Sequence, residues 1–378
     1  MHSNRQFLSI AFLSATLLGG SSVVASAREI DRSDGADHAV FVQTNDLARN
    51  QVLAYHRAAN GALTLAASYD TGGTGFRLNG AGSDPLASQG SLIYDHRHAL
   101  LIGVNAGSHT VYAFRVDGDK LSGRQVIASG GPLPTSVTVH DNLAYVVDAG
   151  GTGSVQGFRI DDDGHLSQIG DSARTLGLTV VTDTTQFLNT PGQIGFTPNG
   201  EQLIVTTKFN GSHIDVFQVR EDGRLSQTAV ANPSATPVPF AITFDAQGQL
   251  VVAQAGGSNV STYALHGDGT LTTLGTVSDG QAALCWIVPA DGNFFGANTG
   301  SADVSAFHID ATGTPSLIGT KSVGLGPIDL SASHGGEFLY VQLGGSGAVA
   351  ELAVSDDGSL QLLGTIATHA GQEGIVAF

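Results

Sequence analysis

Residues 194–225 read IGFTPNGEQLIVTTKFNGSHIDVFQVREDGRL, and this stretch decides the fold. Short runs of Ile, Val, Phe and Leu alternate in it with Pro-Asn-Gly, Asn-Gly and Asp-Gly, whose residues tolerate positive φ or bond their own backbone. The pattern predicts strands at residues 194–196, 203–207 and 214–219, and a fourth strand beginning at Leu225. The continuous apolar run in the second strand favours a strand covered on both faces.

The same unit recurs seven times along the chain. Each copy contains an acidic or Gly-containing turn followed by a leucine, most often as Asp-Gly-x-Leu. The leucines are Leu63, Leu121, Leu166, Leu225, Leu271, Leu317 and Leu360. Four of the steps between them are 45, 46, 46 and 43 residues long, and a fixed period in this range indicates one repeated supersecondary unit. Because four short strands per unit are typical of a propeller blade, we predict an all-β, seven-bladed β-propeller.

The two ends of the chain are predicted to share one blade. The first repeat begins near Ala39 with an apolar run that matches the second strand of a blade. The missing first strand is available at residues 374–378, which read Gly-Ile-Val-Ala-Phe. Pairing of this C-terminal strand with the first blade would close the ring and remove its open edges.

Residues 1–27 have the features of a secretory signal peptide. Arg5 gives a positive start, residues 7–18 are apolar, and residues 25–27 are a small-residue cleavage site. The apolar stretch is too short for a mature membrane anchor. We therefore expect residues 28–378 to form one propeller domain that is secreted or periplasmic, without a membrane span.

The charge balance excludes several classes of partner. The chain has 16 Lys+Arg against 33 Asp+Glu, a formal net charge of −17, so it lacks the basic stripe that nucleic acids require. Its single cysteine, Cys285, permits no intramolecular disulfide and no multi-cysteine metal site. We expect no metal or other cofactor, and a monomer that binds a small molecule at the mouth of the central channel.

Two insertions break the period, at residues 71–89 and 172–192. Both lie between the last strand of one blade and the first strand of the next. Long ordered loops in compact domains are more often functional than idle. In a propeller these connections share a face with those between the second and third strands, so both insertions are predicted to cover the same mouth of the channel.

Motifs within the repeats carry a family resemblance. Residues 190–196 read TPGQIGF at the entry to a first strand, and residues 104–108 (VNAGS) and 110–114 (TVYAF) read as a second strand, its corner and a third strand. Together with the Asp-Gly-x-Leu turns, these residues resemble the lactonase family of seven-bladed propellers, which includes 6-phosphogluconolactonase-like and carboxymuconate-lactonizing enzymes. The resemblance covers residues 39–378 and implies the fold and a lactone-like ligand.

The functional side chains of the family have no counterparts at the corresponding positions of this chain. Members that act on lactones or muconates place His, Arg and Glu side chains around the channel mouth. At the corresponding positions this chain has Pro-Thr-Ser (134–136), Gly-Gln (192–193), Thr-Lys (207–208) and Gln-Ala (254–255). The resemblance therefore implies no catalytic set, and the absence of phosphate-binding cations disfavours a phosphogluconolactonase.

The predicted channel mouth is rich in amides. Amides offer donors and acceptors, so this ring suits a neutral ligand with hydroxyl or carbonyl groups. The predicted ligand-binding residues are Asn105, Gln193, Gln254, Trp286, Asn298 and Gln342. The alternatives are that the amides fix the corner backbone or bridge waters, and that Trp286 packs as a core side chain.

Lys208 and Glu373 are the predicted catalytic residues. A lone lysine beside amides would polarise a carbonyl group, and Glu373 would act as a general base if apolar neighbours raise its pKa. The alternatives are a solvated surface lysine and a carboxylate that caps the ring closure. A nucleophilic Cys285 would need a histidine partner that no spacing provides.

Two functions follow from these predictions. The first is an exported lactonase-like propeller that hydrolyses or forms a lactone of a small sugar- or muconate-like compound. The second is a non-catalytic binding or scaffold propeller that recognises a protein or a glycan through residues 71–89 and 172–192. Fold analogy favours the first and the unmatched family cations favour the second.

Overall fold

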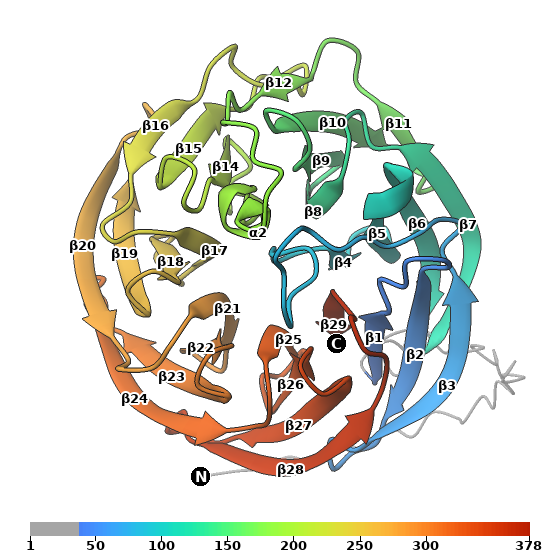
Figure 1. Ribbon diagram of the computed structural model, residues 1–378, viewed down its shortest axis with the longest axis vertical. Helices are drawn as coiled ribbons and strands as arrows, with labels where there is room; N and C mark the ends of the chain where they lie inside the picture. Colours follow the sequence, from blue (N-terminus) through green and yellow to red (C-terminus); the bar gives the residue numbers. More distant parts are fainter. Residues whose placement is uncertain (1–37) are drawn as a thin grey trace, which may run out of the picture. The chain divides into compact units, whose positions relative to one another are not determined.

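The computed structural model describes residues 38–378 as seven antiparallel sheets arranged in a ring (Figure 1). The predicted all-β, seven-bladed propeller is therefore confirmed. The predicted signal peptide, residues 1–27, lies outside the described residues. Within residues 38–378, no helix is long and apolar enough to cross a membrane.

The blades follow one another around the ring in chain order, with the innermost strand first. The first is β29 (Ile375–Ala377), β1 (Ala39–Gln43), β2 (Gln51–Arg57) and β3 (Leu63–Asp70). The second is β4 (Leu92–Asp95), β5 (Leu100–Asn105), β6 (Thr110–Asp117) and β7 (Lys120–Ala128). The third is β8 (Pro134–His140), β9 (Leu143–Asp148), β10 (Ser154–Ile160), β11 (Leu166–Gln168) and the short β12 (Arg174–Thr175).

The remaining four blades have the same order. The fourth is β13 (Ile194–Phe196), β14 (Gln202–Thr206), β15 (His213–Gln218) and β16 (Val230–Pro233). The fifth is β17 (Pro239–Phe244), β18 (Leu250–Gln254), β19 (Asn259–Leu265) and β20 (Leu271–Ser278). The sixth is β21 (Leu284–Ala290), β22 (Asn293–Asn298), β23 (Asp303–Ile309) and β24 (Pro315–Ser322). The seventh is β25 (Pro327–Ala332), β26 (Phe338–Leu343), β27 (Ala348–Val354) and β28 (Leu360–Ala367).

The hydrophobic core lies between neighbouring blades, which explains the continuous apolar runs. In β14, Leu203 and Val205 pack with Tyr145 of the third blade, whereas Ile204 packs with Ile242 of the fifth. Alternate side chains of a strand point to opposite faces, so each blade is buried on both sides. The two faces of every inner strand therefore both have to be apolar.

The ring is closed by the C-terminal strand, as predicted. β29 pairs antiparallel with β1, and Phe41 lies opposite Val376 in this register. The final side chain, Phe378, is buried and stacks on Tyr94 with ring centroids 4.1 Å apart. The last strand therefore ties the first blade to the second.

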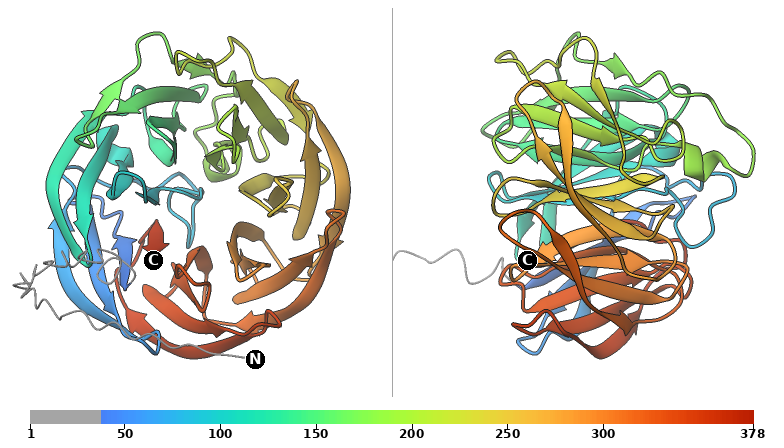
Figure 2. Two further views of the ribbon diagram at one scale, coloured as in Figure 1. Left: turned by 180° about the vertical axis from the view of Figure 1, so that it is seen from behind. Right: turned by 90° about the vertical axis from the view of Figure 1, so that its left-hand side faces the viewer.

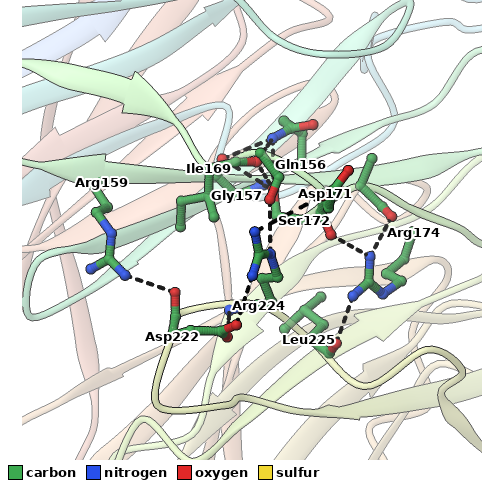
Figure 3. A network of polar contacts seen from close by, with 12 residues as sticks. Gln156, Gly157, Arg159, Ile169, Asp171, Ser172, Arg174, Asp222, Arg224 and Leu225 are labelled. Atoms are coloured by element: carbon green, nitrogen blue, oxygen red, sulfur yellow. Dashed lines mark hydrogen bonds and ion pairs between the residues drawn. The ribbon is translucent and has the colours of Figure 1, made fainter.

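The outer strand of the fourth blade does not begin where the sequence predicts it. Leu225 forms only an isolated bridge with Val219, and β16 begins at Val230. The physical reason is a competing partner, because Arg174 donates hydrogen bonds to the carbonyl oxygens of Leu225 (2.7 Å) and Ser226 (2.9 Å). Figure 3 shows the Arg174 guanidinium bonded to Asp171 on one side and to Leu225 on the other. The start of the second insertion is thereby fixed to the neighbouring blade.

The two insertions stand out from the same face of the ring, as the edge-on view of Figure 2 shows. They also contact each other: Asn79 donates to Thr182 O (2.9 Å), and its backbone N–H donates to Gln186 Oε1 (2.9 Å). The second insertion contains a single helical turn, α2 (Gln186–Asn189), and a 3₁₀ turn, η1 (Ala106–Ser108), follows β5. The prediction that both insertions cover one mouth of the channel agrees with this arrangement (Figure 1).

We predict that Phe378→Ala destabilises the protein by about 3–5 kcal/mol, because the change leaves a cavity at the ring closure. Phe209→Ala is the matched control, since that phenylalanine is 61% exposed and its loss should cost no more than about 0.5 kcal/mol. Urea unfolding of the three proteins measures the difference. Equal effects of the two substitutions would contradict a closure that depends on the last residue.

Candidate functional site

Lys208 joins the two insertions from a buried position. It follows β14 in the corner between the second and third strands of the fourth blade and is 1% exposed. Its ammonium group donates to Ala87 O (2.5 Å) in the first insertion, and to Phe187 O (2.6 Å) and Thr190 Oγ1 (3.0 Å) in the second. All three N–H donors of the ammonium group are therefore used by the protein.

A cavity of about 320 Å³ lies beneath the insertions and beside Lys208. Its walls come from the first insertion, from α2 and from the strand starts and corners of the fourth, fifth and sixth blades. The lining residues are Gly82, Ser83, Asp84, Ala87, Phe187, Leu188, Lys208, Val238, Phe240, Ala255, Gly256, Ala283, Cys285, Trp286 and Thr299. Covered cavities of this size with a few convergent polar groups are the usual form of a small-molecule site.

Asp84 and Glu373 form a pair of carboxyl groups at this cavity. Their side chains are hydrogen-bonded to each other, which requires a shared proton. Asp84 Oδ1 also accepts from Ala87 N (2.7 Å), and Glu373 Oε2 accepts from Leu86 N (3.1 Å). Glu373 Oε1 is buried and meets no donor within residues 38–378.

The proton of the pair belongs to Glu373. Burial raises the pKa of Glu373 well above its ordinary value, and the nearby Asp84 charge raises it further. Burial also raises the pKa of Asp84, but hydrogen bonds and the positive charge of Lys208 oppose the shift. Asp84 is partly exposed whereas Glu373 is 0% exposed, so the negative charge is better tolerated on Asp84.

Two further groups complete the electrostatics of the site. Burial raises the pKa of Asp329 well above its ordinary value, and the Asp84 charge adds to the effect. Burial lowers the pKa of Lys208 to about 8, against the attraction of Asp84. The site therefore combines one ammonium group with three carboxyl groups, and burial raises the pKa of each of these carboxyl groups.

The predicted catalytic residues thus lie close to one another, and Trp286 lies with them. Lys208 and Trp286 line the cavity. Glu373 lies behind Asp84, which lines the cavity and is hydrogen-bonded to the Glu373 side chain. The Trp286 indole N–H donates to Ser88 O (3.1 Å), and its ring lies 5.0 Å from the Phe240 ring, so it is both a core side chain and part of the cavity wall. The catalytic roles of Lys208 and Glu373 stay predictions.

The predicted amide residues are not brought into the cavity. Asn105, Gln254, Asn298 and Gln342 are all 0% exposed. Gln254, for example, accepts from Thr236 and Ser261 and donates to Ser234 and Tyr263. Asn105 and Asn298 likewise bond to buried side chains, whereas Gln342 donates to the Gly374 carbonyl oxygen. Their ligand-binding role stays a prediction.

Gln193 lies instead on the central channel, a separate space of about 620 Å³ lined by the inner strands. The backbone at residues 87–89 lies between the two spaces, since Ala87 lines the cavity and Gln89 lines the channel. The Gln89 side chain spans to β21, where its amide exchanges two 3.0 Å hydrogen bonds with the Ile287 backbone. The cavity and the channel are therefore distinct sites.

Cys285 lines the cavity without the chemistry of a nucleophile. Burial raises the pKa of its thiol, and the Asp84 charge raises it further, so the group stays protonated. Within residues 38–378, no cluster of three or more His, Cys, Asp or Glu side chains is arranged to hold a metal ion.

Asp84 is the site residue that the sequence reasoning missed. It lies in the first insertion, and a segment outside the repeat cannot be aligned with a blade position. The available signal was the insertion itself, because an acidic residue within a loop that covers the channel mouth is a candidate for the site.

We predict that Lys208→Met loosens the insertions while the ring stays folded. Methionine fills similar volume but donates no hydrogen bonds, so exchange of backbone amides in residues 76–88 and 180–190 should become at least about tenfold faster. Hydrogen exchange read by mass spectrometry measures this. The exposed Lys120→Met is the control, and equal protection in both variants would contradict the role of Lys208 as the link between the insertions.

We also predict that the free energy of unfolding falls as pH rises from about 4.5 to 7. Glu373 and Asp329 hold protons in the folded state that the unfolded chain releases, and burial likewise raises the pKa of Asp215 to about 6 and of Asp148 to about 7. A raised folded-state pKa stabilises the protein below the unfolded pKa, and this contribution is lost as pH rises through the folded value.

Glu373→Gln isolates the site's share of this effect. The amide cannot ionise, so the slope of unfolding free energy against pH should decrease by up to about 1.4 kcal/mol per pH unit. Denaturant unfolding at intervals from pH 4.5 to 7 gives the slope. The exposed Glu337→Gln is the control, and a slope unchanged in Glu373→Gln would show that Glu373 is already ionised.

Comparisons with known proteins agree with the fold. The family model described as "Lactonase, 7-bladed beta-propeller" matches residues 252–377. No curated protein sequence matches the chain. A periplasmic gluconolactonase of Pseudomonas aeruginosa superposes with a TM-score of 0.72 at 17% identity, over 89% of this chain and 98% of its own.

Two further solved structures show how widely this fold is used. A provisionally assigned 6-phosphogluconolactonase of Bacteroides fragilis has a TM-score of 0.70 at 17% identity, over 88% of this chain and 96% of its own. The virginiamycin B lyase of Staphylococcus aureus has a TM-score of 0.51 at 12% identity, over 72% and 82% of the two chains. Likeness at these identities shows the fold alone. With the family model matching the last third of the sequence, the resemblance of this chain to the lactonase family of seven-bladed β-propellers is confirmed.

Proposed function

We propose that the protein hydrolyses a small lactone in the covered cavity. The observation that carries the proposal is the Asp84–Glu373 carboxyl pair placed at the cavity beside the Lys208 ammonium group. Buried titratable groups with shifted pKa values and a specific charge partner are typical of catalytic sites. The names of two structural neighbours, a gluconolactonase and a provisionally assigned 6-phosphogluconolactonase, support the choice of reaction by analogy.

The residues suggest a general-base mechanism. The Asp84 carboxylate takes a proton from a water molecule, whose oxygen attacks the lactone carbonyl carbon. The resulting oxyanion is stabilised by the charge of Lys208 and by the hydroxyl of Ser83, which bonds to no other group within residues 38–378. The ring C–O bond then breaks, and the departing alkoxide takes back the proton held by Asp84. The product is the open hydroxy acid.

Glu373 and Lys208 act differently in this proposal from their predicted roles. Glu373 stays protonated behind Asp84 and holds it by a hydrogen bond, so Asp84 replaces it as the general base. Lys208 contributes its charge while its N–H donors hold the insertions.

We further propose that the protein works in a secreted or periplasmic location, which the periplasmic neighbour and the sequence of residues 1–27 support.

One observation favours the alternative of a non-catalytic binding propeller. Because the protein uses all three Lys208 donors, no ammonium N–H points to a substrate carbonyl. Absence of turnover across a panel of neutral lactones would support this second function.

We predict that Asp84→Asn lowers kcat for lactone hydrolysis by about 10²–10⁴, the usual contribution of a positioned general base, with little change in KM. Asparagine keeps the shape and the hydrogen bond from Ala87 N, so the insertions should stay in place. The exposed turn variant Asp357→Asn is the control. pH-stat assays on γ- and δ-lactones measure the rates. A kcat of Asp84→Asn within a factor of three of the wild-type value would exclude Asp84 as the base.

A further inference from the structure

The walls of the cavity are mostly apolar. Its aromatic wall is formed by Phe187, Phe240 and Trp286, and aliphatic side chains complete it at Leu188, Val238, Ala87, Ala255 and Ala283. The Lys208 ammonium lies only 5.1 Å from the centre of the Phe240 ring, so the charged groups and the aromatic wall adjoin. A ligand that fits this space has one polar group and an apolar remainder.

The polar groups of the cavity are few and mostly occupied. Thr299 Oγ1 donates to Pro327 O (2.9 Å), and the three Lys208 donors bind protein oxygens. Among the described lining residues, the side-chain polar atoms left for a ligand are those of Ser83 and Asp84, the accepting oxygen of Thr299 and the weakly polar Cys285 thiol. The several hydroxyl groups of a sugar lactone would therefore lose their hydrogen bonds to water without replacement, which is unfavourable.

The local charge also disfavours an anionic ligand. Asp84, Glu373 and Asp329 interact electrostatically with one another, and within residues 38–378 Lys208 is the cation that acts on Asp84. A ligand carboxylate would approach the Asp84 charge, and the ammonium has no free N–H to bind it. A muconate-like acid is therefore a poor fit.

From these observations we propose that the cavity takes an uncharged lactone that bears an apolar substituent, rather than a sugar lactone or a muconate-like acid. The inference rests on the proposed lactone hydrolysis for the reaction, but the ligand class follows from the walls of the cavity and the charges around it. The lactone carbonyl would lie at Ser83 and Asp84, with the substituent against Phe240 and Trp286.

Binding can be measured without turnover, because Trp286 is the single tryptophan of the chain and lines the cavity. The probes are three lactams, which resist hydrolysis: 6-pentyl-δ-valerolactam, unsubstituted δ-valerolactam and gluconolactam. Titration of tryptophan fluorescence should give a Kd for the pentyl compound at least about tenfold lower than for either of the others. Equal or tighter binding of gluconolactam, or no binding of any probe, would overturn the inference.

A pair of variants tests whether the substituent occupies the apolar wall. Ala255→Leu adds volume inside the cavity and should abolish most of the advantage of the pentyl compound. Ala246→Leu makes the same change at an exposed turn on the opposite face and should leave it intact. Retention of the advantage in Ala255→Leu would contradict the assigned position.

The hydrolysis proposal and this inference fail in different ways. Selective binding of the pentyl lactam without turnover of the matching lactone would support the ligand class and reject hydrolysis. Turnover of gluconolactone at least as efficient as that of 6-pentyl-δ-valerolactone, measured as kcat/KM, would support hydrolysis and reject the ligand class.

Discussion

The buried ammonium group of Lys208 is the interaction on which the site depends. An ammonium removed from water has to be bonded by oxygens, and here these come from both insertions. One of these oxygens is Ala87 O. The N–H of Ala87 donates to Asp84, and the N–H of the preceding residue, Leu86, donates to Glu373. Fixing Ala87 therefore fixes the carboxyl pair. A single cation thus places the cover of the cavity and its carboxyl pair at the same time.

The closure of the ring and the site share residues. Glu373 directly precedes the closing strand region, its N–H donates to Gln43 O (3.1 Å), and its carbonyl accepts from Gln43 Nε2 (2.9 Å). The strand pairing that seals the first blade therefore also sets the position of a buried carboxyl group. Proteins often have this arrangement, in which a rigid scaffold positions functional groups that lie on its loops.

Most of the fold was predictable from the sequence, because a blade is a repeated local unit and its turns leave a regular mark. The period gave the number of blades, and the unmatched first repeat gave the closing strand.

The site was predictable only in part. Lys208, Glu373 and Trp286 follow from the repeat, whereas Asp84 lies in an insertion that has no repeat position. The amides Asn105, Gln254, Asn298 and Gln342 lie at the expected corners, but spacing does not reveal that all four are fully buried. The displaced outer strand of the fourth blade depends on Arg174, a contact from outside the repeat.

The central claim is that ligands occupy the cavity under the insertions and not the central channel. A crystal structure of the protein soaked with 6-pentyl-δ-valerolactam tests it most directly. We expect ligand density between Trp286 and Asp84, with Lys208 still bonded to both insertions. Density confined to the channel beside Gln193, with the cavity unchanged, would contradict it.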